Sequence, residues 1–87
     1  MQENSVTTLL RQKTDAALDV IKDAIVELLK SERDGLTNSA IAEKLGLQSE
    51  YEGKHKGYLS WSIIGLLLRD RRIHKIGRKY MSGPKPT

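Results

Sequence analysis

The fold is decided by residues 36–47, which read Leu36-Thr37-Asn38-Ser39-Ala40-Ile41-Ala42-Glu43-Lys44-Leu45-Gly46-Leu47. Thr37 or Asn38 can cap a helix here, since their side chains accept the backbone N–H groups that a helix leaves free at its start. The apolar residues Ile41, Ala42 and Leu45 share one side of the following turns, and Gly46 suits the left-handed conformation that ends a helix. We therefore expect a short helix over residues 38–45, stable only when docked on its neighbours.

A longer helix is expected before this stretch, ending near Arg33. Its apolar residues recur three, four, three and one positions apart, which places them on one helical stripe. They are Leu18, Ile21, Ile25, Leu28 and Leu29, joined by Ala17 and Ala24. Gly35 is expected as a left-handed cap after this helix. Val6 and Leu10 fall on the same stripe when the count is extended backward, so two starts stay open, at Ser5 and at Thr14.

Two different patterns follow residue 47. Residues 48–57 have no apolar periodicity, and two glycines bracket Lys54-His55-Lys56, so we expect a polar loop. Residues 58–70 read YLSWSIIGLLLRD, which is too long and too apolar for an ordinary strand and predicts a buried helix. Its expected core face, widened by Ile64 and Leu68, consists of Leu59, Ile63, Leu66 and Leu67.

The last element has the pattern of a hairpin. Residues 72–76 and 79–81 contain β-branched and aromatic members, and Gly77-Arg78 between them suits a two-residue turn. The fold class expected is therefore mainly α with a small β-hairpin, an α+β fold. We expect an N-terminal extension at residues 1–13, which can be helical, one domain at residues 14–82 and a disordered tail at residues 83–87.

Length and composition limit the class of protein. The chain has 87 residues, enough for one core, and its 38% hydrophobic and 30% charged residues are typical of a globular domain. It has no cysteine, which excludes disulfides and thiolate metal sites. No apolar window of about 18 residues occurs, and residues 1–4 lack the start of a signal peptide. We expect a cytoplasmic protein, associated with the nucleoid if its host is a bacterium.

The charge is distributed unevenly along the chain. Residues 1–46 carry six basic and eight acidic side chains, whereas residues 47–87 carry nine basic and three acidic ones. The net charge of +4 therefore averages a half at −2 and a half at +6. A basic segment of this kind indicates a polyanionic partner, with a solvated basic surface as the alternative.

The chain resembles the winged helix-turn-helix superfamily of DNA-binding domains in two respects. One is the order of its expected elements, and the other is the motif formed by Ile41-Ala42 and Leu45-Gly46-Leu47. The resemblance covers about residues 16–82. One departure is that about ten residues separate the second and third helices, where the family commonly has only a few. The resemblance implies that double-stranded DNA is the partner, and that the protein is a transcriptional regulator or an accessory DNA-binding module.

The resemblance also implies which residues face DNA, with the third helix in the major groove and the hairpin on the backbone or minor groove. On and before the third helix they are Lys56, Tyr58, Ser60, Ser62 and Arg69. Around the hairpin turn they are Lys75, Arg78 and Lys79. Thr37, Asn38 and Ser39 would bind a phosphate through backbone N–H groups, and Lys54 and His55 add positive charge beside the third helix.

Several of these residues also have a structural interpretation. Ser60 and Ser62 suit the start of a helix as caps, Trp61 is expected to pack rather than stack on a base, and Tyr80 is expected to anchor the hairpin to the first helix. Arg69, Arg71 and Arg72 can pair with Asp70 or with acids of the first helix instead of phosphate. The third helix has no Asn or Gln, so strong sequence-specific readout by it alone is not expected.

No enzyme, cofactor or metal site is expected. His55 and His74 are 19 residues apart without cysteine, which does not make a zinc site, and both are expected to face solvent or phosphate. Glu52-Gly53-Lys54 has the Glu-x-Lys form of metal-dependent nucleases but lies in the expected loop.

The alternatives to a DNA-binding regulator are a winged helix used for protein contact, the DNA-targeting part of a larger nuclease or restriction system, and an RNA-binding module. A homodimer through the N-terminal segment and a separate protein partner also stay open.

Overall fold

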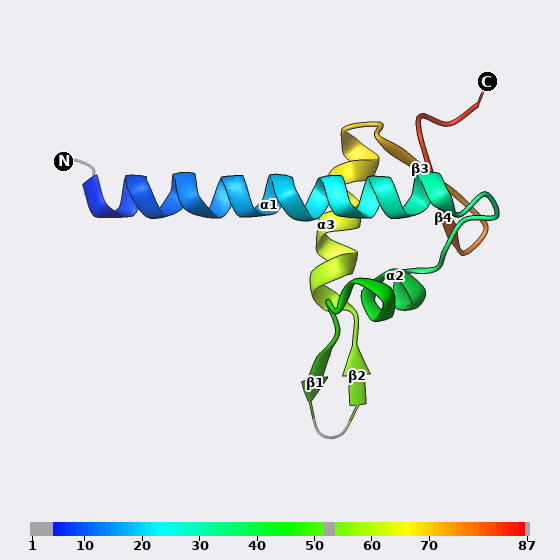
Figure 1. The fold of residues 1–87 in the computed structure, drawn as a ribbon, viewed down its shortest axis with the longest axis horizontal. Helices are drawn as coiled ribbons and strands as arrows, with labels where there is room; N and C mark the ends of the chain where they lie inside the picture. The colour runs from blue at the N-terminus through cyan, green and yellow to red at the C-terminus, as the bar shows by residue number, and fades with distance from the viewer. Residues whose placement is uncertain (1–4, 52–53, 87) are drawn as a thin grey trace.

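The computed structural model describes residues 5–51 and 54–86, apart from the side chains of residues 50, 51, 54 and 55. Its helices are α1 (Ser5–Ser31), α2 (Asn38–Leu45) and α3 (Tyr58–Arg69). Its strands form two antiparallel pairs, β1 (Ser49–Tyr51) with β2 (Lys54–Lys56) and β3 (Ile73–Ile76) with β4 (Lys79–Ser82). The expected α+β class is therefore confirmed. Figure 1 shows α3 crossing the C-terminal half of α1.

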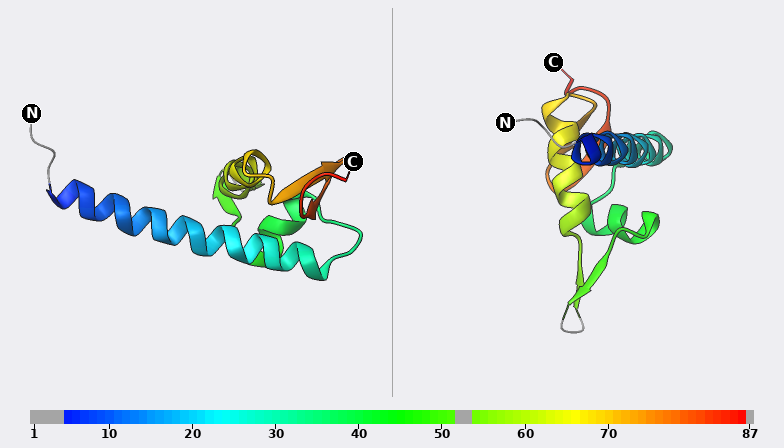
Figure 2. Two further views of the ribbon diagram at one scale, coloured as in Figure 1. Left: turned by 90° about the horizontal axis from the view of Figure 1, so that it is seen from above. Right: turned by 90° about the vertical axis from the view of Figure 1, so that its left-hand side faces the viewer.

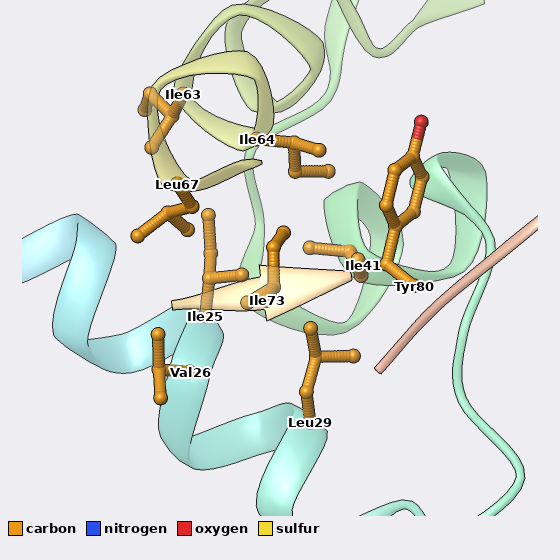
Figure 3. Packing of buried hydrophobic residues seen from close by; sticks show 9 residues of the cluster. All are labelled: Ile25, Val26, Leu29, Ile41, Ile63, Ile64, Leu67, Ile73 and Tyr80. Carbon is orange, nitrogen blue, oxygen red and sulfur yellow. The ribbon is translucent and has the colours of Figure 1, made fainter. Parts of the chain in front are cut away.

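One apolar cluster joins all three helices to the β3–β4 hairpin (Figure 3). Its buried members are Ile25, Val26 and Leu29 of α1, Ile41 of α2, Ile63, Ile64 and Leu67 of α3, Ile73 of β3 and Tyr80 of β4. Leu18 and Ile21 pack against it only partly. The predicted stripe of the first helix therefore forms the core through its C-terminal half.

Helix α2 begins and ends at the predicted residues. The Thr37 side chain accepts a hydrogen bond from the Ala40 backbone N–H at 3.2 Å. Gly46 is left-handed, with φ at +69°, and the Leu47 N–H bonds back to the Ala42 carbonyl at 2.8 Å. Both ends are fixed by residues adjacent in sequence, which is why the pattern predicted them.

The β3–β4 hairpin also forms as predicted. Ile76 pairs with Lys79, which leaves Gly77 and Arg78 as a two-residue turn, and Gly77 has a φ of +62°. Tyr80 is 6% exposed and exchanges two backbone hydrogen bonds with Leu36, at 2.7 and 3.0 Å. The expectation that Tyr80 anchors the hairpin is confirmed, and the Leu36 pairing ties the connection between α1 and α2 to β4.

Residues 48–57 do not form the predicted loop. Ser49 pairs with Lys56 and Tyr51 with Lys54, so the segment is an antiparallel ribbon of two three-residue strands, the β1–β2 ribbon. It projects away from α1 (Figures 1 and 2). The prediction was wrong because no apolar face marks these strands, and alternation of apolar residues is the signal by which a strand is recognised.

Helix α3 buries most of its predicted core face. Ile63, Ile64 and Leu67 are buried as expected, whereas Leu59 is 49% exposed and Ser60 is buried in its place. The Ser60 hydroxyl is satisfied inside the protein by the Asn38 side chain and the Gly57 carbonyl. This polar contact allows serine to take the interior position.

Helix α1 is continuous from Ser5, the earlier of the two expected starts. Val6 and Leu10, expected on the core stripe, are 58% and 56% exposed, so that expectation was wrong. The N-terminal half of α1 extends beyond the rest of the protein (Figures 1 and 2). The radius of gyration is accordingly 15.1 Å, against about 12 Å for a compact domain of this length.

Candidate functional site

The side of α3 turned away from the core carries Tyr58, Trp61, Ser62, Gly65 and Arg69, all exposed, and we call it the outer face of α3. Tyr58 and Trp61 are 67% and 63% exposed. Trp61 is therefore more exposed than the partly buried packing residue that was expected. The available signal was its spacing, since Trp61 lies three residues after Tyr58 and four before Gly65 and so shares their side of the helix.

A shallow hollow of about 260 Å³ joins the outer face of α3 to the β3–β4 hairpin. Trp61, Ser62 and Gly65 line it from α3, and Lys75 and Tyr80 line it from the hairpin. The Lys75 ammonium lies 5.4 Å from the centre of the Tyr80 ring, within the range of a cation–π interaction. This contact holds a positive charge at the edge of the hollow. The sequence predicted Lys75 here but not its aromatic partner.

A second hollow, of about 290 Å³, lies at the start of α3, where Asn38, Gly57, Tyr58 and Trp61 line it. Trp61 lines both hollows and is 63% exposed. An exposed aromatic side chain can stack on another ring or pack against a sugar.

The side chains of two predicted DNA-contact residues, Asn38 and Ser60, have structural roles. The Asn38 side chain donates to the Gly57 carbonyl at 3.1 Å and accepts from the Ser60 hydroxyl at 2.6 Å, and Ser60 is fully buried. These bonds fix the start of α2 against the start of α3. Ser60 is thus removed from any surface contact, since it lies on the core side of the helix.

The other residues at the start of α2 divide between cap and surface. The Thr37 side chain is engaged as the helix cap, while Ser39 is exposed beside it. Ser62, for which a capping role was also considered, lies exposed on the outer face of α3.

Most of the predicted basic residues are at the surface. Arg69, Lys75, Arg78 and Lys79 are exposed, and Lys56 is half-buried at the end of the β1–β2 ribbon. Arg78 occupies the tip of the β3–β4 hairpin. The side chains of Lys54 and His55 lie outside the described residues.

Two other polar residues of the C-terminal half contact the rest of the protein: Arg72 binds α1, and His74 faces inward. Arg72 forms an ion pair of 2.7 Å with Asp23 of α1, which confirms for Arg72 the alternative of pairing with an acid. His74 is only 9% exposed and its Nδ1 lies 2.9 Å from the Gly83 carbonyl oxygen, so the expectation that it faces solvent was wrong. Gly83 was expected in the disordered tail. Its backbone N–H donates a second hydrogen bond, to the Arg72 carbonyl at 2.8 Å.

Comparisons with family models, with curated proteins and with solved structures give no match for this chain. Within the described ranges, no three histidine or acidic side chains gather as metal ligands could. In the same ranges, no helix combines the length and apolar character needed to cross a membrane.

Proposed function

We propose that the protein binds double-stranded DNA through the outer face of α3 and the β3–β4 hairpin. The observation that carries this proposal is the hollow of about 260 Å³ in which Lys75 of the hairpin lies beside Ser62 and Gly65 of α3. The basic C-terminal half of the chain is thereby joined to a helix face, as DNA recognition by a winged helix requires.

The residues of this surface suit different parts of the DNA. Arg69, Lys75, Arg78 and Lys79 supply cations for phosphates, and Lys56, just before α3, supplies a fifth. Ser62 and Gly65 have small side chains, and a Cβ on Gly65 would meet no atom within 4 Å, so the DNA backbone can approach α3 closely there. Phosphate contacts give affinity and orientation but little sequence information. Since α3 lacks Asn and Gln, we propose binding governed mainly by backbone charge, as an accessory or regulatory module.

The test is a fluorescence titration of a labelled mixed-sequence duplex at two salt concentrations, about 50 and 200 mM. The protein should bind with a micromolar or lower dissociation constant at the lower salt and much more weakly at the higher. The double variant Arg78→Glu/Lys79→Glu should lose at least about tenfold in affinity, because it replaces two phosphate ligands by repulsive charges. Both residues are exposed, so the fold should be unaffected.

The matched control is Arg11→Glu/Lys30→Glu, which makes the same change in charge at two exposed positions of α1. It should bind within about threefold of the original, because these residues are outside the proposed surface. Absence of salt-sensitive binding at micromolar protein, or equal losses in the two double variants, would overturn the proposal.

A second candidate function is protein contact, and the exposure of apolar side chains favours it. Trp61, Leu59 and Ile76 are 63%, 49% and 55% exposed. Against it, Ile64 is buried and Leu68 is half-buried, so α3 has fewer surplus apolar residues than its sequence indicated. The charge-reversal variant separates the two functions, since unchanged DNA binding in Arg78→Glu/Lys79→Glu would favour protein contact.

A further inference from the structure

The N-terminal half of α1 carries apolar side chains that the core does not use. Leu9, Leu10 and Val20 are 64%, 56% and 69% exposed. They recur at helical spacing with one lysine and two alanines, and we call the set the outer stripe of α1. It consists of Leu9, Leu10, Lys13, Ala16, Ala17 and Val20.

Most of the outer stripe faces away from the core side of α1, while Leu10 and Ala17 lie at its edge, about 60° and 80° round the helix from Ile25. At about 100° per residue, Val20 lies about 140° and Leu9 about 160° round the helix from the buried Ile25. Figure 1 and the left view of Figure 2 show the N-terminal half of α1 extending past the other elements. An unsupported helical segment of this length is only marginally stable in water, so a covering partner would stabilise it.

We propose that a second copy of this chain covers the outer stripe, with its own α1 antiparallel, to form a homodimer. Antiparallel pairing about residue 15 sets Leu10 opposite Val20 and Lys13 opposite Ala17 of the second copy. Leu10 and Lys13 then each face a smaller side chain, while Leu9 faces Ile21 and Ala16 faces Thr14 of the second copy. The pairing is two-fold symmetric, so both copies use the same surface and the contact closes.

Parallel pairing of the same stripe fits poorly. It would set Lys13 against Lys13, a like-charge contact, and Ala17 against Ala17, which leaves space between the helices. In the antiparallel arrangement the Lys13 side chain instead extends over a small alanine, with its stem in apolar contact and its ammonium group in water.

The charge around the outer stripe also favours a second copy over a membrane surface. Helices that lie on membranes carry a polar face rich in Lys and Arg. Here positions 11 to 23 carry Asp15, Asp19 and Asp23 against Arg11, Lys13 and Lys22, so this part of the helix has no net positive charge. These acids are unfavourable beside anionic lipids but remain in water in the dimer, since they lie outside the stripe.

The first test is the molar mass in solution, measured by light scattering or sedimentation from about 1 to 100 µM protein, the range that covers weak dimers. The mass should rise from the monomer value of 9.8 kDa toward twice that value. Leu10→Glu should remain monomeric over this range, because it puts a charge in the stripe. Leu10 lies outside the core, so this variant leaves the domain folded.

The matched control is Gln12→Glu, which adds the same charge two residues away but about 200° round the helix. It should dimerise as the original chain does. A chain that stays at 9.8 kDa at every concentration, or equal effects of the two variants, would overturn the proposal.

The second test determines the direction of pairing and uses the absence of cysteine from the chain. A mixture of Leu10→Cys and Val20→Cys chains should form a mixed disulfide dimer under mild oxidation. Leu10→Cys alone should not, because the two positions would lie about 15 Å apart along the helices, beyond disulfide reach. Rapid self-linking of Leu10→Cys, with little mixed product, would overturn the antiparallel arrangement.

Discussion

At residue scale, Gly35 must be glycine for two reasons: its backbone is left-handed, and β4 lies close to it. Its φ is +77°, and a Cβ there would lie 2.8 Å from the Tyr80 carbonyl oxygen and 2.9 Å from the Met81 side chain. Gly77 has a similar φ of +62°, but a Cβ there would meet no atom within 4 Å. The two glycines therefore share a conformational requirement and differ in the space around them.

We expect Gly35→Ala to destabilise the protein by about 2–4 kcal/mol, since it adds a backbone clash to the strain of a left-handed alanine. Gly77→Ala should cost only about 1 kcal/mol, because it adds strain without a clash. Urea denaturation of the two variants beside the original chain measures both values. Equal losses of unfolding free energy would show that the contact with β4 does not constrain Gly35.

At element scale, the starts of α2 and α3 are held together by a small polar group. The Asn38 side chain donates to the Gly57 carbonyl and accepts from the Ser60 hydroxyl, whose single hydrogen is shared with that carbonyl, 3.0 Å from the Ser60 oxygen. A Cβ on Gly57 would lie 2.8 Å from the Asn38 amide nitrogen, so glycine is needed for this approach. The group sets the orientation in which α3 presents Tyr58 and Trp61.

We expect Asn38→Ala and Ser60→Ala each to lower the free energy of unfolding by about 1–3 kcal/mol, the cost of leaving buried polar atoms unpaired. The double variant should lose less than the sum of the two by at least about 0.5 kcal/mol, because they share a hydrogen bond. Ser39→Ala, an exposed neighbour, serves as control and should change stability by at most about 0.5 kcal/mol. Additive losses in urea denaturation would contradict the shared contact.

Sequence reasoning succeeded where an element is determined locally. The bounds of α2 follow from Thr37 and Gly46, and the β3–β4 turn follows from Gly77, all within a few residues of the structure they control. In α3 it identified Ile63, Ile64 and Leu67 as core residues but misplaced Leu59 and Ser60, because the burial of Ser60 depends on a hydrogen bond between residues 38 and 60, 22 positions apart. The buried serine could not be inferred from periodicity, because the leucine beside it is the more apolar choice.

The residues of the candidate site, like the fold, were predicted only in part. The exposed cations Arg69, Lys75, Arg78 and Lys79 were predicted, since charged side chains without a buried partner stay in water. Trp61 was missed because its apolar character was given more weight than its position on the helix. The Lys75–Tyr80 contact was missed because it connects two strands through their pairing.

At the scale of the whole molecule, the proposed dimer and the proposed DNA surface use opposite parts of the chain. The outer stripe of α1 lies in the acidic half, and the cations lie in the basic half. The core between them fixes α3 to the C-terminal half of α1 (Figure 1). The proposed dimer contact therefore uses none of the cations proposed to bind phosphate, and a dimer bound by both copies would add their phosphate contacts together.

If the phosphate contacts of the two copies add together, the salt dependence of the proposed DNA binding can be predicted. Each copy offers five cations to DNA, namely Lys56, Arg69, Lys75, Arg78 and Lys79. One copy should therefore give a slope of log affinity against log salt of about −4.5, and a dimer bound by both copies about −9. Between 50 and 200 mM salt these slopes correspond to losses of roughly several hundred-fold and roughly 10⁵-fold.

We therefore expect the slope to distinguish bound monomer from bound dimer when DNA binding is titrated on a duplex long enough for two copies. The original chain and Gln12→Glu should show the steeper slope, and Leu10→Glu the shallower one. The three proteins keep the same five cations, so only the number of copies on the DNA differs. Equal slopes in all three, with the mass measurements showing dimers for the original chain, would mean that only one copy of the dimer contacts DNA.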